Sequence, residues 1–222
     1  MSTGKLQYSE GDTAAGPPAR RGRPRMVSDE ERRKAILQAA YAAFVELGFA
    51  RTTTAIVAAK AKVSKRSIYE LFENKTRLFA EVVREHRHVM LDLPRPADED
   101  LPPLETLSRI FRLDIPDEED VEREAVLRLI VRESQQLPEL SDYLYENGII
   151  RAREELIEWL DRENCRGRIR SEDTLVCAGM LMDIVFGALL PRRRLKTAGE
   201  RTQRREHIRK RLEIFLRGIG AM

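Results

Sequence analysis

The 222-residue sequence predicts an all-α protein, and three observations support this fold class. Apolar residues recur at helical spacing through most of the chain. Gly and Pro gather at a few places that separate these stretches, and no run of alternating strand-type residues lies between turn signals. Hydrophobic residues make up 42% of the chain and charged residues 35%, a balance typical of a helical protein with a charged surface.

The first 27 residues are predicted to form a disordered basic arm, because residues 1–19 are rich in Gly, Ser, Thr and Pro. The end of the arm, RRGRPR at residues 20–25, resembles the AT-hook, a peptide that lies in the narrow minor groove of A·T-rich DNA. Its candidate minor-groove or phosphate contacts are Arg21, Arg23 and Arg25. An unstructured basic tail is the alternative, but the arm directly precedes the helical hairpin described below, which favours contacts with nucleic acid.

The second part of the chain, residues 28–92, begins with a long helix. Ser28–Glu31 is a capping box, in which the Ser hydroxyl and the Glu carboxylate bond the first free backbone N–H groups. Apolar residues follow at helical spacing, among them Ile36 and Phe44. Gly48 ends the helix, because glycine adopts the positive φ that commonly follows a last helical turn. This helix is predicted to support the hairpin that follows it.

The next segment predicts a helix-turn-helix. Thr53–Lys60 is helix-forming, residues 61–63 are too few for anything but a turn, and Ser64 caps a second helix, Ser64–Leu71. Asn74 caps a third helix, which is predicted to run to about Asp92 and to link this domain to the rest of the chain. The second helix exposes small and basic side chains, so it can enter the major groove of DNA.

Charge is distributed unevenly along the chain. Residues 1–92 carry 17 basic and 11 acidic side chains, a balance of +6, whereas residues 93–222 carry 23 basic and 26 acidic ones, a balance of −3. Arg51–Arg66 contains five basic residues and no acidic one, which supplies an attraction to phosphate that does not depend on sequence. A solvated hairpin with incidental lysines is the alternative. The coincidence of charge, hairpin and arm favours DNA binding.

The stretch from Arg32 to Val83 resembles, without a gap, the DNA-binding domain of the TetR/AcrR family of one-component transcriptional regulators. The matching residues are Gly48-Phe49, Thr52-Thr53, Val57-Ala58, Ala61-Lys62-Val63-Ser64, Tyr69, Phe72, Lys75 and Leu78-Phe79. There are two departures. Lys62 replaces the usual Gly of the turn, at a cost of about 1 kcal/mol if φ is positive there. Leu71 replaces a His that often precedes the Phe, and a leucine cannot make the phosphate contact that a His could make there.

The exposed positions and the resemblance together predict the DNA contacts. The residues expected to face the major groove are Lys65, Arg66, Ser67 and Tyr69. The residues expected to bind phosphates are Thr52, Thr53, Tyr69 and Lys75. In the family the linking helix transmits the regulatory motion, so the resemblance implies the same for the helix that begins at Asn74.

The third part, residues 93–222, is predicted to be a helical regulatory and dimerisation domain. It begins with the linker LPRPADEDLPP, which has four prolines and three consecutive acids. The predicted helices are Leu104–Leu113, one that Pro116 opens, one from Pro138 toward Asn164 with a break at Asn147-Gly148, Ser171–Leu190, and about Arg201–Gly218.

The last two predicted helices suggest an interface between two copies of the chain. The first is apolar nearly all round and must be buried on several faces. Two copies would also present recognition helices about 34 Å apart, or a multiple of that, to an inverted-repeat site. The alternative is that both helices cover the core of one copy. The candidate interface residues are Leu175, Ala178, Gly179, Met182, Ile208, Leu212, Phe215 and Leu216.

In the TetR/AcrR family the second domain holds a small-molecule pocket, so the resemblance implies an effector, whose identity is unknown. The candidate lining residues are Phe111, Ile130, Trp159, Met180, Asp183 and Phe186, and for each of them core packing is the alternative. Asp183 is the most informative, because a carboxylate within an apolar helix needs a partner. That partner is an Arg, a cationic ligand or the second subunit.

Nothing in the sequence indicates an enzyme, a cofactor or a metal site. G-x-S-x-G, H-E-x-x-H, Walker and C-x-x-C motifs are absent, and the three histidines lack the spacing of ligands. Two cysteines exclude a disulfide framework and favour a reducing cytosol. The N-terminus lacks the apolar core of a signal peptide, and the run Leu175–Leu190 is shorter than the ~20 residues of a membrane span. A cytoplasmic protein without a membrane partner is expected.

The sequence therefore predicts a homodimeric TetR-type transcriptional regulator, expected to be a repressor, whose partners are double-stranded DNA, a second copy of itself and the effector. In the mechanism that the resemblance implies, the ligand stabilises a dimer whose recognition helices no longer fit the operator. Two alternatives stay open. One is a sequence-indifferent DNA-binding protein that uses the arm and the basic last helix. The other is an interaction module of the same fold that does not bind DNA, which the Lys62 departure favours.

Overall fold

The computed structural model describes residues 1, 28–148, 150–189, 195 and 197–221. Over these ranges the chain forms eleven helices and no strand, which confirms the all-α prediction. The helices are α1 (Asp29–Leu47), α2 (Thr54–Ala61), α3 (Lys65–Leu71), α4 (Lys75–Glu85), α5 (Arg87–Met90), α6 (Pro103–Ile110), α7 (Asp117–Gln136), α8 (Pro138–Glu146), α9 (Ala152–Cys165), α10 (Thr174–Leu189) and α11 (Ala198–Gly218). The predicted arm contacts Arg21, Arg23 and Arg25 lie outside the described residues.

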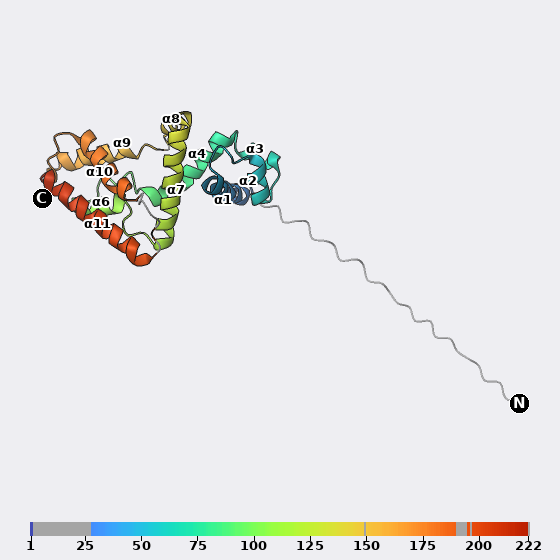
Figure 1. Ribbon diagram of the computed structural model, residues 1–222. Helices are drawn as coiled ribbons and strands as arrows, with labels where there is room; N and C mark the ends of the chain where they lie inside the picture. The colour runs from blue at the N-terminus through green and yellow to red at the C-terminus, as the bar shows by residue number, and fades with distance from the viewer. Residues whose placement is uncertain (2–27, 149, 190–194, 196, 222) are drawn as a thin grey trace.

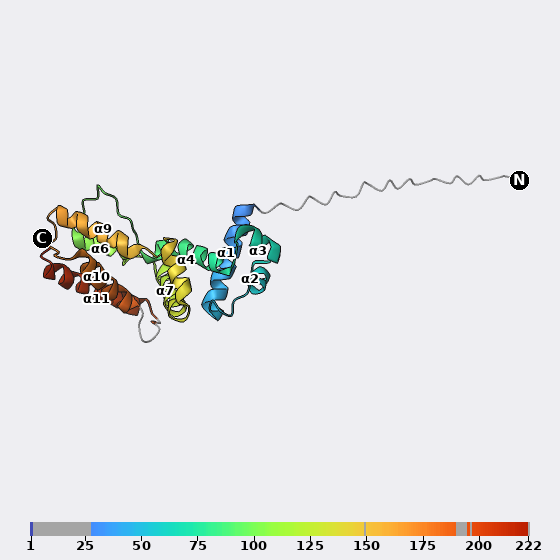
Figure 2. The ribbon, with the colours of Figure 1, turned by 90° about the horizontal axis from the view of Figure 1, so that it is seen from above.

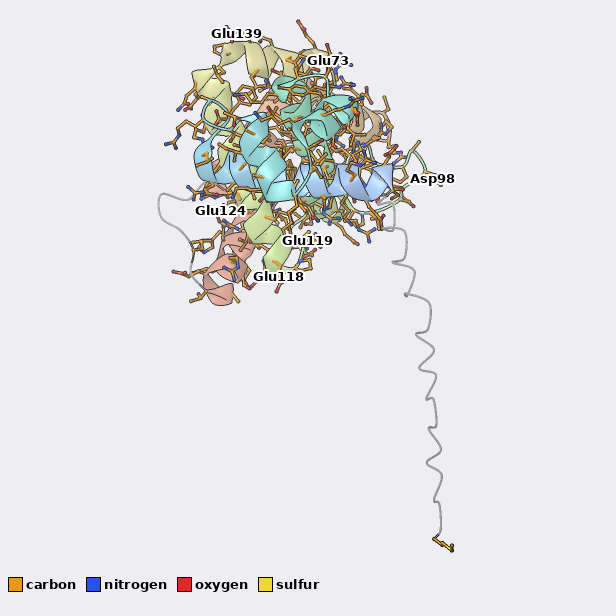
Figure 3. All side chains as sticks on the ribbon, turned by 90° about the vertical axis from the view of Figure 1, so that its right-hand side faces the viewer. Glu73, Asp98, Glu118, Glu119, Glu124 and Glu139 are labelled. Atoms are coloured by element: carbon orange, nitrogen blue, oxygen red, sulfur yellow. The ribbon has the colours of Figure 1, made fainter. Side chains whose placement is uncertain are left out.

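The helices form two lobes with α7 and α8 between them. Figure 1 shows α1 to α4 in the N-terminal lobe, and α6, α9, α10 and α11 in the C-terminal lobe. The long helix α7 stands between the lobes, and the view from above in Figure 2 places it there as well. Figure 3 looks onto the N-terminal lobe, and the labels Glu118 and Glu119 mark the N-terminal end of α7 below that lobe.

Short polar residues begin the helices of the N-terminal lobe as predicted. The Ser28 hydroxyl accepts from the N–H of Glu31 at 3.1 Å, and the Glu31 carboxylate accepts from the N–H of Ser28 at 2.9 Å, so the capping box is present. The Ser64 hydroxyl caps α3 at 3.0 Å from the N–H of Ser67, and the Asn74 side chain caps α4. These bonds satisfy N–H groups that would otherwise lack an acceptor.

The linking helix is shorter than the sequence suggested. Instead of running to Asp92, it ends at Glu85, and α5 follows after His86. The His86 ring has local and distant partners: its Nδ1 lies 2.7 Å from the carbonyl oxygen of Val82, and its Nε2 lies 3.2 Å from Glu122 of α7. It also stacks on Tyr41 of α1 at 4.3 Å between ring centroids. These contacts hold His86 at the junction of the two lobes.

The protein has two hydrophobic cores, and α7 contributes to both. The first core joins α1 to α4 with three buried leucines from α7 and α8, which are Leu129, Leu140 and Leu144. The second core joins α6, α9, α10 and α11, and Leu127 of α7 belongs to it. Alternate faces of one helix are therefore buried against different lobes. The chain's single Trp, Trp159, is buried in the second core.

Candidate functional site

The helix-turn-helix consists of α2 and α3, which we call the hairpin. The Thr53 hydroxyl caps α2 by accepting from the N–H of Ile56 at 3.3 Å. On α3, Ile68 is buried against the first core, as is Phe72 directly after the helix. Because these two residues fix which side of α3 faces inward, the opposite side of the helix is turned to solvent. That outer side carries Lys65, Arg66 and Tyr69, as the sequence predicted.

The outer side of α3 presents a mixed set of hydrogen-bonding groups. The Arg66 side chain is 88% exposed, and its Nε donates to the Glu70 carboxylate one turn later at 2.9 Å. The Tyr69 hydroxyl lies 3.2 Å from the hydroxyl of Thr54 on α2, which ties the two helices together. Ser67 is half-buried, and its hydroxyl lies 2.9 Å from that of Ser64. An exposed guanidinium on such a helix can bond the O6 and N7 atoms of guanine in the major groove.

Lys62 adopts the conformation that the sequence comparison with the family assigns to Gly. Its φ of 55° and ψ of 40° lie in the left-handed region, and it ends α2. The N–H of Val63 then bonds the carbonyl oxygen of Ala58 at 3.0 Å, which closes the helix end. The turn therefore keeps its shape, and the lysine side chain is exposed. The cost of the departure is backbone strain and not a different turn.

Lys62→Gly should raise the free energy of unfolding by about 1 kcal/mol, because glycine adopts a positive φ without the clash of a Cβ atom. Urea denaturation followed by circular dichroism measures the change. Lys62→Ala is the control, since it removes the same charge but keeps the Cβ atom and should gain nothing. Equal stability of the two variants would show that the left-handed residue carries no strain.

Thr52 does not have the phosphate-binding side chain that we predicted. It is fully buried, and its hydroxyl donates to the carbonyl oxygens of Gly48 at 2.7 Å and Ala43 at 3.1 Å. These carbonyls belong to the end of α1, where helical hydrogen bonds stop. The hydroxyl therefore stabilises the turn between α1 and α2, and the hydroxyl of Thr53 is the one that remains at the surface.

Lys75 is also directed at the protein. Its Nζ donates to the carbonyl oxygen of Phe49 at 2.9 Å and lies 4.3 Å from the centroid of the Phe49 ring. Burial lowers the pKa of this ammonium group, while the nearby Glu133 carboxylate opposes that shift. The predicted phosphate contact is thus replaced by a tie between the start of α4 and the turn that precedes α2.

The end of α1 is contacted by α7, a helix that lies far from it in the sequence. Arg132 donates through Nη2 to the carbonyl oxygen of Phe44 at 3.0 Å, across 88 positions of the chain. No local pattern marks such a contact. The link between Thr54 and Tyr69 was also missed, although the three consecutive threonines at the start of α2 were a signal for a third hydroxyl at this place.

The six candidate pocket residues are spread over two cores and the surface. Phe111 and Trp159 are buried in the second core, and Phe186 packs edge to face on Phe111 with centroids 6.3 Å apart. Ile130 packs on the first core instead, and Met180 is 49% exposed on α10. A groove of about 500 Å³ lies elsewhere, between α1, the α4–α5 junction and α7, where Tyr41, His86 and Glu122 are among the lining residues.

Asp183 is not buried within one copy of the chain, so its carboxylate does not require a partner inside its own core. Asp183 lies on the exposed side of α10, so water solvates its carboxylate. The mean composition of the helix suggested burial on every face, but α10 buries one face only. Its buried residues include Ala178, Leu181 and Val185 at helical spacing, and Asp183 lies outside that stripe.

Most of the candidate interface residues are in the core of one copy. Ala178, Gly179, Ile208, Leu212, Phe215 and Leu216 are buried, and Met182 is half-buried. For Gly179 the cause is the Arg153 side chain of α9, which lies against its Cα position. These residues therefore fit the alternative in which α10 and α11 cover the core of one copy. Leu175, by contrast, is 58% exposed.

The outer sides of α10 and α11 expose a different set of large apolar residues. We call it the α10–α11 patch: it consists of Leu175, Val176, Met180 and Ile214, which are 49–68% exposed. Exposed large apolar side chains are candidates for an interaction surface where they lie together. Over the described ranges, every helix is too short or too polar to span a membrane.

Comparisons with known proteins cover both lobes. Residues 36–82 match the family described as bacterial regulatory proteins, tetR family, and residues 119–220 match the AefR-like transcriptional repressor C-terminal domain. Two uncharacterised HTH-type transcriptional regulators of Bacillus subtilis, YdeS and YhgD, are 49% identical over 57 residues and 37% identical over 73 residues. These matches cover 26% and 33% of this chain, and only 27% and 37% of the two relatives.

A solved structure extends the likeness over most of the chain. It is a TetR family transcriptional regulator from Pseudomonas syringae pv. tomato str. DC3000, 25% identical in sequence, with a TM-score of 0.58. The alignment covers 83% of this chain and 94% of that one. The likeness is therefore not confined to the helix-turn-helix.

Proposed function

The chain belongs to the TetR family of transcriptional regulators, and on that premise we propose that it represses transcription by binding an inverted-repeat operator as a homodimer in the cytoplasm. The observation that carries the proposal is the outer side of α3. A short helix held by Ile68 and Phe72 turns Lys65, Arg66 and Tyr69 outward, where a major groove would meet them.

The proposed dimer is formed by the α10–α11 patch. Val176 and Met180 are one turn apart on α10, and Ile214 lies on α11, which packs against α10. Large apolar side chains on two neighbouring helices are a surface that a second copy covers with the same surface, as in a two-fold symmetric interface. A single hairpin contacts too few bases to select one site, so two copies are needed for an operator.

The proposed effector is a small molecule that binds the C-terminal lobe. The match of residues 119–220 to the C-terminal domain of a transcriptional repressor supports this assignment of roles to the lobes. In the proposed mechanism the effector stabilises a dimer whose hairpins no longer fit both half-sites. Repression then ends because the protein leaves the operator.

Arg66→Ala should weaken binding to a selected operator about tenfold and change binding to random duplex much less, because a guanidinium that bonds a base contributes about 1–3 kcal/mol of discrimination. Fluorescence anisotropy with both duplexes measures the two affinities. The matched control is Arg109→Ala. Arg109 also pairs with a glutamate at i,i+4 spacing, Glu105, but it lies on α6 in the other lobe.

Equal losses for operator and random duplex in Arg66→Ala would show that Arg66 contacts phosphate only. Loss of operator binding in Arg109→Ala as well would show that charge, and not position on α3, determines the affinity.

A further inference from the structure

The N-terminal half of α7 is fixed to α11 by ion pairs. The Asp120 carboxylate is fully buried and accepts from Arg204 at 2.7 Å. One turn earlier, Asp117 accepts from Arg201 at 3.0 Å and from Arg205 at 3.1 Å. Because these pairs join two helices at three points, a displacement of α11 relative to the rest of its lobe must move this end of α7.

The C-terminal half of α7 is fixed to the end of α1. The Nη2 of Arg132 donates to the carbonyl oxygen of Phe44 at 3.0 Å, and its Nε donates to the Glu133 carboxylate at 2.7 Å. Glu133 is only 2% exposed. The positive charge of Arg132 at the C-terminal end of α1 also interacts favourably with the dipole of that helix. Arg132 therefore contacts the end of α1, and Glu133 holds the guanidinium of Arg132 in that position.

The contact reaches the turn that positions the hairpin, residues 48–52. A Cβ atom on Gly48, whose φ is +84°, would lie 3.2 Å from Oε1 of Glu133 and 3.5 Å from Nη2 of Arg132. Inside the turn, the hydroxyl of Thr52 bonds the Gly48 carbonyl, and Lys75 bonds the Phe49 carbonyl. Since α2 begins directly after this turn, a change at the end of α1 moves α2 and α3.

We propose that Arg132 and Glu133 are positioning residues for the hairpin and that α7 carries displacements of α11 to it. This inference rests on the proposed function. It differs from transmission through α4, which the family resemblance implies, because the contact lies at the end of α1. With one end of α7 fixed to the helix of the proposed dimer interface and the other to the turn before α2, the rotation of the two hairpins in a dimer follows the position of α7.

The test compares Arg132→Met with Arg128→Met. Both changes remove one guanidinium from α7 and keep most of the aliphatic stem. The two side chains are 41% and 42% exposed, but Arg128 pairs with Glu124 of its own helix and gives no hydrogen bond to α1 among the described contacts. Three measurements follow: amide hydrogen exchange over residues 44–52 without DNA, the ratio of affinities for a selected operator and random duplex, and the fluorescence of Trp159 during the operator titration.

Arg132→Met should exchange faster over residues 44–52 than Arg128→Met, and it should lower the affinity ratio about tenfold, the effect of losing one charge-assisted bond. In the wild type and in Arg128→Met, operator binding should change the fluorescence of Trp159, which lies in the second core. In Arg132→Met that change should be lost. Arg132→Lys, which keeps a cationic donor, should recover part of the exchange protection.

Equal exchange in the two Met variants would overturn the role of Arg132 at the turn. If Arg132→Met exchanged faster than Arg128→Met over residues 44–52 but kept the wild-type affinity ratio, Arg132 would stabilise the turn without positioning the hairpin. A wild-type Trp159 signal that does not respond to operator would overturn transmission along α7. If the wild type preferred no duplex at all, the proposed function would fail, and the exchange measurement would still decide whether Arg132 fixes the turn.

Discussion

Asp120→Ala should lower the free energy of unfolding by about 3–5 kcal/mol, the range observed when one member of a buried ion pair is removed. Asp120 and Arg123 are both fully buried, and Arg204 is 8% exposed. Asp120 accepts hydrogen bonds from both arginines. Burial lowers the pKa of Arg123, and the Asp120 carboxylate opposes that shift. Without the carboxylate, two guanidinium groups face each other in the core.

Urea denaturation followed by circular dichroism measures this loss. Glu105→Ala is the matched control, because Glu105 also pairs with an arginine of its own helix, at 3.1 Å, but on the surface. Its loss should cost less than about 1 kcal/mol, as for most exposed pairs. If the two variants were equally stable, the cluster of Asp120, Arg123 and Arg204 would not hold α7 to α11.

Met180→Glu should convert the proposed dimer to monomers at micromolar concentration and weaken operator binding about a hundredfold, because the second half-site contact is no longer intramolecular. Met180 lies in the α10–α11 patch and is 49% exposed, so a single copy should keep its fold. In a symmetric interface the introduced carboxylate appears twice, and burial of two unpaired charges is strongly unfavourable.

Analytical ultracentrifugation and an operator titration measure the two effects. Val121→Glu is the control, because Val121 is exposed to a similar extent, 53%, but lies on α7 outside the patch. That variant should stay dimeric. A dimeric Met180→Glu would mean that the patch does not form the interface, and a monomeric wild type would contradict the proposed homodimer.

Local signals in the sequence predicted the elements of the N-terminal lobe well. Ser28, Ser64 and Asn74 accept the bonds expected of caps, because capping depends on neighbours three positions away. The sequence also predicted the inward side of α3 from Val63, Ile68 and Phe72, of which Ile68 and Phe72 are buried and Val63 is half-buried. The start of α11 was missed by three residues, since the capping box at Thr197 and Glu200 was overlooked.

Polar residues near the hairpin were harder to assign, because phosphate oxygens and backbone carbonyls attract the same side chains. Thr52 and Lys75 bond carbonyls of the turn between α1 and α2, and only the fold brings those carbonyls to them. No local sequence pattern could predict the role of Arg132, because only the fold brings its carbonyl partner close. Its partner, Phe44, is on α1 of the N-terminal lobe, 88 positions earlier in the chain.

The faces of α10 could not be predicted, because the helix has apolar residues on nearly every side. A hydrophobic pattern of that kind does not distinguish a core face from an interface face. The structure buries Ala178 and Leu181 and exposes Val176, Met180 and Asp183, so the expected interface shifts to neighbouring positions on the same helix.

Selection of bound duplexes from a random DNA library, with the purified 222-residue chain, is the measurement that tests the proposed function most directly. The expected result is an enriched inverted repeat whose half-sites are separated by about one helical turn of DNA or a multiple of it, as two hairpins on a symmetric dimer require. Enriched DNA without a shared motif would contradict operator recognition and favour sequence-indifferent binding, and recovery of no DNA would favour an interaction module that does not bind DNA.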